Sequence, residues 1–213
     1  MLRLRDIPEA IEGDPCGRSS VHTGTLAAVP LTRIEPEAAA ALVRPAWVRA
    51  VITAVFAAFT IFWTDDTMTV ARFALAAFFI LCATAVWDYV KSERVPPALT
   101  GALAVGAVAW LISGVAALFA ASTGALAIIA GVGFLVMGAC EFYGALKVRT
   151  EFVPSRDHVI LGVVGILTGV GLFLGVGLDP HGILGISGTG VIIMAVLLLI
   201  SAAGLTHESR SAR

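Results

Sequence analysis

The chain has 213 residues, of which 58% are hydrophobic and only 14% are charged, and its formal net charge is −1. A soluble domain averages about 25% charged residues, so this composition excludes an ordinary soluble fold and favours a membrane protein. A net charge near zero predicts no nucleic-acid partner. The cysteines Cys16, Cys82 and Cys140 lie far apart in the chain, so we expect neither a disulfide framework nor a metal site, and no cofactor.

Residues 1–46 are predicted to form a disordered cytoplasmic tail. This segment holds five of the nine prolines together with charges of both signs, a composition that buries too little apolar surface to fold. A docking segment for a partner is the alternative to plain disorder. Within the tail, a short helix from Pro36 to Arg44 is a second alternative, because proline suits a first helical turn and four alanines follow it.

Six long apolar segments follow the tail. Crossing a bilayer takes about 20 residues of helix at about 1.5 Å per residue, and each segment comes close to that length. The predicted spans are residues 47–63, 68–90, 100–120, 124–146, 159–178 and 183–205. They leave a transmembrane domain over 47–205, a short cytoplasmic tail over 206–213, and no room for a second folded domain.

The first, third and fifth spans each contain a shared five-residue core. Two aliphatic residues precede a hydroxyl residue, a very small residue and valine at 51–55, 111–115 and 166–170. The copies recur at about the length of one helix pair, which is typical of an internal repeat. The predicted fold class is therefore an all-α membrane protein whose six transmembrane helices form three repeated hairpins, residues 47–90, 100–146 and 159–205.

Basic residues are unevenly distributed among the connections. The segments at 64–67, 121–123 and 179–182 contain no lysine or arginine, whereas the second and fourth connections and both tails do. The positive-inside rule therefore predicts that both termini are cytoplasmic. The three connections without basic residues are very short, so we expect no folded domain on the outer side.

Glycines in the fifth span predict close helix packing. Gly165 with Gly169, and Gly171 with Gly175, form two frames of small residues four apart, the spacing that lets helix backbones approach in lipid. We expect the third hairpin to be the most tightly packed. A homodimer interface or contact with a protein partner within the bilayer is the alternative.

Arg72 is the one basic residue on the predicted outer side, one turn inside the second span. Ionisable residues within a membrane are pointers to function because their burial is costly. We expect Arg72 to reach the outer headgroups or to pair with Asp65, Asp66 or Asp179. A role in handling a substrate or proton is the alternative.

Two acids lie near the inner ends of spans. Asp88 has Lys91 three residues beyond it on the same helical face, and Glu141 has Lys147 and Arg149 just beyond it. We predict interfacial salt bridges for both acids. Proton handling is the alternative, for which Glu141 is the better candidate because it lies deeper.

His181 lies beside Asp179 in the last outer turn. A histidine titrates near neutral pH, so His181 is either a sensor of external acid or a plain exposed side chain. Catalytic signatures such as a nucleophile elbow, a zinc-binding His-Glu-x-x-His or a phosphate loop are missing from the sequence. We therefore predict that the protein is not an enzyme.

The hydroxyls of Thr53, Ser113 and Thr168 occupy equivalent positions of the repeat. Convergence of the three on one axis is what a transporter would use, because a transport site needs polar groups near the midplane. Hydroxyls this short more often bond their own helix backbone, which is the alternative.

Over about residues 46–205 the chain resembles the HdeD family of bacterial inner-membrane proteins. The resemblance rests on the three hydroxyl-small-valine cores, on the short outer turns at Asp65-Asp66 and Asp179-Pro180, and on the predicted cytoplasmic termini. It implies a six-helix protein of the bacterial plasma membrane that is associated with acid-stress resistance and has no established catalytic residues. The proline-rich tail is a departure from a minimal member.

Two other functions are compatible with the residues. A small transporter or proton-conducting channel would use Arg72, Asp88 and Glu141. An accessory subunit of a larger membrane complex would need no polar site of its own. A water-filled path to Glu141 would favour the transporter, whereas a dry centre would favour a non-enzymatic protein of stress adaptation.

Overall fold

The computed structural model describes residues 36–65, 67–150 and 152–210, and these residues form six helices and no strand. The helices are α1 (Pro36–Phe62), α2 (Met68–Val90), α3 (Pro97–Leu118), α4 (Thr123–Val148), α5 (Ser155–Leu174) and α6 (Pro180–Arg210). Each is long and apolar enough to cross a membrane. The prediction of an all-α membrane protein with six spanning helices is confirmed at this level.

The first and last helices extend beyond the predicted spans. α1 begins at Pro36, so the helix continues through Pro45 into residues that the sequence assigned to the tail, and α6 continues to Arg210. Proline is well accommodated at the start of a helix, and the alanines that follow favour it. The expectations for residues 1–35 and 211–213 lie outside the described residues.

Short polar side chains cap the helices that start at one end of the bundle. Thr67 accepts a hydrogen bond from the Val70 amide at 3.3 Å, Ser122 from Ala125 at 3.2 Å, and Asp179 from Gly182 at 2.8 Å. Such caps satisfy amides that have no partner within the helix. At the other end, α3 and α5 begin directly after prolines. Each connection therefore turns the chain within a few residues.

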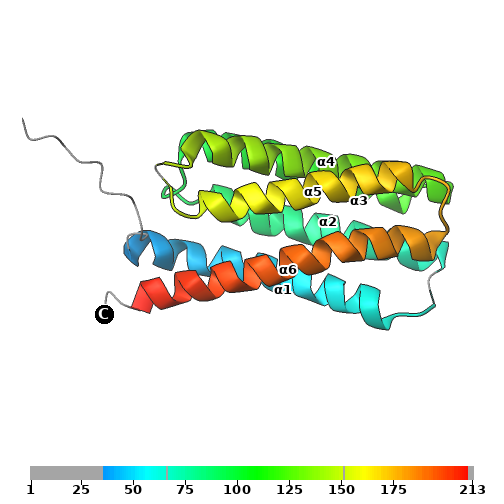
Figure 1. The fold of residues 1–213 in the computed structure, drawn as a ribbon, viewed down its shortest axis with the longest axis horizontal. Coiled ribbons are helices and arrows are strands. Elements are labelled where there is room, and N and C mark those ends of the chain that lie inside the picture. Colours follow the sequence, from blue (N-terminus) through cyan, green and yellow to red (C-terminus); the bar gives the residue numbers. More distant parts are fainter. Residues whose placement is uncertain (1–35, 66, 151, 211–213) are drawn as a thin grey trace, which may run out of the picture.

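Each helix contacts the next one in the chain, and α6 contacts α1, so the six helices form a closed ring in chain order. Figure 1 shows the bundle from the side. α1 lies beside α6, which closes the ring, and α4 packs along α5 in the most extensive interface. Contacts between α1 and α2 and between α5 and α6 are much sparser. α2, α4 and α6 also touch one another, so these three helices line the centre of the bundle.

Glycines bring the backbones of α4 and α5 into contact. A Cβ atom placed on Gly169 would lie 2.7 Å from the Gly131 carbonyl oxygen, and one on Gly165 would lie 3.0 Å from Gly138 Cα. The expectation that the third hairpin packs most tightly is therefore wrong, because α5 makes its closest approach to α4, in the second predicted hairpin. The glycine frame indicated a close neighbour but not which helix it would be.

The second glycine frame does face α6. A Cβ atom on Gly171 would lie 3.2 Å from Ile186 Cγ2, and one on Gly175 would lie 2.9 Å from Ile186 Cδ1. Both frames of α5 thus contact helices of the same chain.

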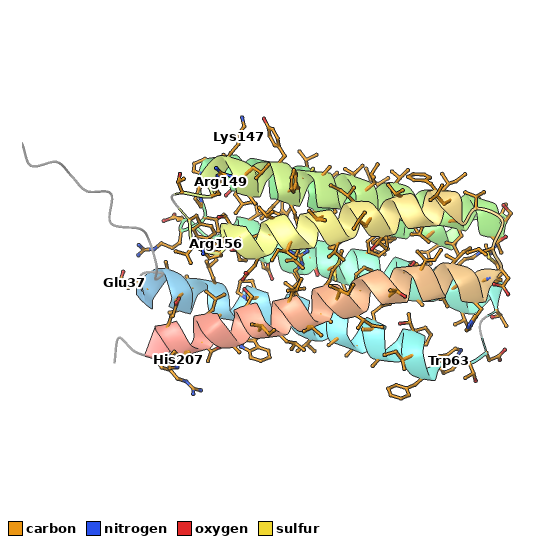
Figure 2. All side chains as sticks on the ribbon, in the orientation of Figure 1. Glu37, Trp63, Lys147, Arg149, Arg156 and His207 are labelled. Atoms are coloured by element: carbon orange, nitrogen blue, oxygen red, sulfur yellow. The ribbon has the colours of Figure 1, made fainter. Side chains whose placement is uncertain are left out.

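Charged side chains gather at one end of the molecule. Figure 2 shows Lys147, Arg149 and Arg156 at the end where Glu37 and His207 also lie, and Trp63 at the other end. The end that carries Lys147, Arg149 and Arg156 is called the basic end; α1 begins there and α6 ends there. The end that carries Trp63 is called the opposite end.

Candidate functional site

A buried cluster of ionisable side chains lies within the bundle towards its basic end. Glu141 on α4 is only 1% exposed, and its Oε1 atom lies 2.6 Å from Nη1 of Arg49 on α1. The same oxygen lies 3.5 Å from Nδ1 of His158 on α5, and both partners are also buried. Arg49, Glu141 and His158, from three different helices, are called the charge cluster below.

Glu141 does not pair with the basic residues that follow it in the sequence. Lys147 instead places its Nζ 4.8 Å from the centre of the Tyr143 ring, and Arg149 lies at the surface of the basic end. The predicted first span begins at residue 47, which places Arg49 at the membrane boundary and not among the candidate site residues. With α1 starting at Pro36, Arg49 lies more than three turns inside the helix. An arginine surrounded by apolar residues was the available signal.

Aromatic rings surround the charge cluster. The guanidinium carbon of Arg49 lies 5.5 Å from the centre of the Trp110 ring, within the range of a cation–π interaction. The Tyr89 ring meets His158 edge-on, with 5.5 Å between ring centres. Within the described chain, Nε of Arg49 has no hydrogen-bond partner. The arginine is thus a buried cation with one donor still available.

A small cavity of about 30 Å³ adjoins the cluster. Its polar lining residues are Arg49, Tyr89, Asp157, His158 and Ser201. This space is sufficient for a water molecule, and the lining offers the two to four polar partners that a buried water needs.

A second cavity of about 240 Å³ lies next to the first at the basic end, between α5 and α6. The two share Asp157 and Ser201 as wall residues, and the outer one also reaches Arg156 and Glu208. The cluster is therefore adjoined, on the side of the basic end, by hollow space that is mostly apolar and holds a few polar side chains.

Buried aromatic rings of α2, α3 and α4 form a packed layer beyond the cluster, called the aromatic layer below. It consists of Phe78, Phe79, Trp110 and Phe134, all buried, with ring centres 5.1 Å apart for Phe79 and Phe134 and 5.7 Å apart for Phe78 and Trp110. Phe134 lies two helical turns before Glu141 on α4, about 10 Å further from the basic end. Trp110 belongs to the layer and also contacts Arg49, so the layer lies directly against the cluster.

The hydroxyls of Thr53, Ser113 and Thr168 are buried but make separate contacts. Thr53 and Thr168 each donate a hydrogen bond to the carbonyl four residues earlier, at 2.7 and 2.8 Å. Ser113 faces Gly133 on α4. The expectation that such short hydroxyls bond their own helix is confirmed for the two threonines.

Asp88 pairs with Lys91 at 3.7 Å across one turn, at the exposed end of α2. This local pair agrees with the spacing in the sequence. A second exposed pair, Glu37 with Arg94 at 3.1 Å, ties the start of α1 to the connection between α2 and α3. The predicted tail over 1–46 includes Glu37, so the sequence does not predict this contact.

The predicted outer group does not assemble around Arg72. Within the residues that the structure describes, partly buried Arg72 forms no ion pair with Asp65 or Asp179, and its Nε has no hydrogen-bond partner. Asp179 instead caps α6, and His181 is exposed in the first turn of that helix. Asp66 lies outside the described residues.

Comparison with known proteins identifies no relative: no protein-family model, no curated protein and no solved structure matches the chain. The resemblance to HdeD proteins therefore stays a prediction from the sequence.

Proposed function

We propose that this chain is a non-enzymatic protein of the bacterial inner membrane that acts in acid-stress adaptation and does not carry a solute across the bilayer. The acid-stress role comes from the resemblance to the HdeD family. The observation that carries the non-transporting role is the aromatic layer, in which buried rings of α2, α3 and α4 pack against one another inside the bundle. A transport site would place convergent polar groups there. Protection would come from packing in the bilayer or from binding a partner.

The proposed architecture is three repeated hairpins, α1–α2, α3–α4 and α5–α6, with both termini in the cytoplasm. Two observations support it. The second helices of the hairpins are the three that meet at the centre, and the labelled basic side chains gather at the end where α1 begins and α6 ends (Figure 2). Reporter fusions at the N-terminus, at Glu93, at Arg149 and at the C-terminus should all report the cytoplasm. A fusion that reports the outer side would overturn this orientation.

Survival in acid tests the proposed role directly. A strain lacking the gene should survive acid exposure less well than its parent, and the wild-type gene should restore survival. Equal survival of the two strains would remove the acid-stress role.

A variant of the outer turns localises any response. Asp65→Asn, Asp66→Asn, Asp179→Asn and His181→Ala combined should restore survival less well than wild type, if acid acts at the outer turns. Full restoration by this variant would remove the outer turns from the proposed function while leaving the role itself intact.

A proton-conducting channel is the second candidate, favoured by the buried charge cluster and the cavities that approach it from the basic end. Proton flux into liposomes separates the two functions. Liposomes that contain the wild-type protein should show no more proton flux than empty liposomes. The Phe79→Ala/Phe134→Ala variant, which opens the aromatic layer, should leak measurably and shows that the assay can detect a path. Wild-type flux well above that of empty liposomes would establish the channel instead.

A further inference from the structure

We infer that the charge cluster is a proton-binding site that exchanges protons through water with the basic end only. His158 accepts the proton, the carboxylates of Glu141 and Asp157 balance its charge, and the aromatic layer closes the way to the opposite end. This inference goes beyond the proposed function, because it rests on the geometry of the cluster and not on any role in acid stress.

The charges around His158 favour uptake of one proton. Glu141 on α4 lies 3.5 Å from its Nδ1, Arg49 on α1 shares that carboxylate, Tyr89 of α2 packs against the ring, and Asp157 precedes it on α5. Among the described walls of the inner cavity, α3 and α6 add no ionisable side chain. The outer cavity adds one charge of each sign, Arg156 of α5 and Glu208 of α6, and so leaves the balance unchanged. With a neutral imidazole, the site holds one cation and two carboxylates. A proton on His158 gives the site two positive and two negative charges, so no charge is left uncompensated inside the membrane.

The route for the proton is the pair of adjoining cavities. The inner cavity touches His158 and Arg49, the outer one reaches the surface between α5 and α6, and Asp157 and Ser201 line both. The unpartnered Nε of Arg49, the imidazole and the Ser201 hydroxyl offer hydrogen-bonding partners to water in the inner cavity.

The direction of access follows from the aromatic layer. The Trp110 ring centre lies 5.5 Å from the Arg49 guanidinium carbon, and the packed rings of Phe78, Phe79 and Phe134 continue from it. Phe134 lies about 10 Å further from the basic end than Glu141. Water that reaches the cluster therefore enters from the basic end.

Nuclear magnetic resonance of labelled histidine tests the proton site. His22→Gln, His181→Gln and His207→Gln combined leave His158 as the only histidine in the purified full-length protein. We expect its ring nitrogens to report reversible protonation as the pH is lowered while the circular dichroism shows intact helices. An imidazole that stays neutral at every pH at which the protein remains folded would overturn the proposal.

Carboxylate variants in the same background test the charge balance. At a fixed acid pH, Glu141→Gln should lower the protonated fraction of His158 several-fold. Asp157→Asn leaves the buried ion pair intact and should lower the protonated fraction of His158 less. This second variant tests the proposal even if Glu141→Gln does not fold. Asp88→Asn removes an exposed carboxylate and should leave the fraction unchanged. Equal fractions in wild type and Asp157→Asn would contradict the role of the carboxylates.

Thiol labelling tests the side of access. Cys16, Cys82 and Cys140 are replaced by alanine, and a single cysteine is introduced as Ser201→Cys or, as a matched control on the same helix, as Ser187→Cys. Ser187 is completely buried and lies about 21 Å along α6 from Ser201, towards the opposite end. A membrane-impermeant thiol reagent should modify Ser201→Cys only from the side of the vesicle that exposes the basic end, and Ser187→Cys from neither side. Labelling of Ser201→Cys from both sides, or from none, would overturn one-sided access.

The two assays also separate this inference from the proposed function. Proton flux by the wild-type protein would refute the non-transporting function, yet protonation of His158 in the labelled protein would still establish the site. Absence of flux together with a neutral His158 would leave the proposed function intact and remove the proton site.

Discussion

α4 is joined to α5 and to α1 by opposite kinds of contact. Towards α5, glycines let the two backbones touch, so that a Cβ on Gly138 would lie 2.6 Å from the Ile166 amide nitrogen. Among the described residues, the backbones of α4 and α1 do not come into contact, and the side chains of Glu141 and Arg49 bridge the gap between the two helices. α4 therefore packs closely against α5 through its backbone, and it contacts α1 only through an ion pair between long side chains.

The difference shows how each contact can fail. Lipid is as apolar as a protein core, so the glycine interface depends on close approach, and any added atom separates the helices. The ion pair does not need the backbones of α1 and α4 to be close, because the side chains are long. Losing one partner, however, leaves the other as an uncompensated buried charge. Substitutions should therefore affect the two interfaces through different mechanisms and by different amounts.

The largest effect is expected from breaking the ion pair. Glu141→Leu leaves Arg49 buried without its carboxylate, and the free energy of unfolding should fall by about 3–5 kcal/mol. Reversible unfolding in mixed micelles with increasing sodium dodecyl sulfate, followed by circular dichroism, measures the change. The double variant Arg49→Met/Glu141→Leu removes both charges and should recover most of the loss. A single variant as stable as wild type would mean that the pair is not buried.

The glycine interface should respond less strongly, through overpacking. The added Cβ of Gly138→Ala meets the Ile166 nitrogen at 2.6 Å and the Gly162 carbonyl oxygen at 2.7 Å, and both are backbone atoms that cannot rotate away. We expect a loss of about 1–3 kcal/mol in the same unfolding assay. Gly101→Ala is the matched control on α3, because no atom lies within 4 Å of its Cβ position, and it should cost nothing. Equal behaviour of the two variants would contradict the close approach of α4 and α5.

A smaller effect is expected where α1 meets α6. The indole nitrogen of Trp47 donates a hydrogen bond to the Thr206 hydroxyl at 2.9 Å, near the basic end. Trp47→Phe keeps an aromatic ring but loses this donor, so stability should fall by about 0.5–1.5 kcal/mol. Trp87→Phe changes a half-exposed tryptophan on α2 and serves as the control. If both variants lose the same stability, the hydrogen bond contributes nothing specific.

The smallest effect is expected at the exposed ion pair. Asp88 and Lys91 carry the same kind of charges as Glu141 and Arg49, but their side chains are about two-thirds exposed to solvent. Water and salt screen such a pair, so Asp88→Asn should change the free energy of unfolding by less than about 0.5 kcal/mol. Comparing Asp88→Asn with Glu141→Leu isolates the effect of burial on an ion pair. A loss at Asp88 comparable to that at Glu141 would contradict this explanation.

Local features of the sequence determined the helices and their local contacts. Six apolar runs of bilayer length specify six helices, because a chain in lipid must satisfy its backbone hydrogen bonds internally. The pairing of Asp88 with Lys91 follows from a three-residue spacing on one helix. The capping role of Asp179 and the contacts of Thr53 and Thr168 with their own helix are local in the same sense.

Only the tertiary structure decided which helices are neighbours and where the buried charges meet. Gly165 and Gly169 predict a close partner for α5, but the same frame would serve α4 or α6, and α4 is the helix that packs there. Glu141, Arg49 and His158 come from three different helices, and no local spacing relates them. Their meeting depends on the order of helices around the ring and on the rotation of each about its axis. Periodicity along a nearly uniform apolar sequence carries little information about either, because lipid and protein neighbours offer almost the same environment.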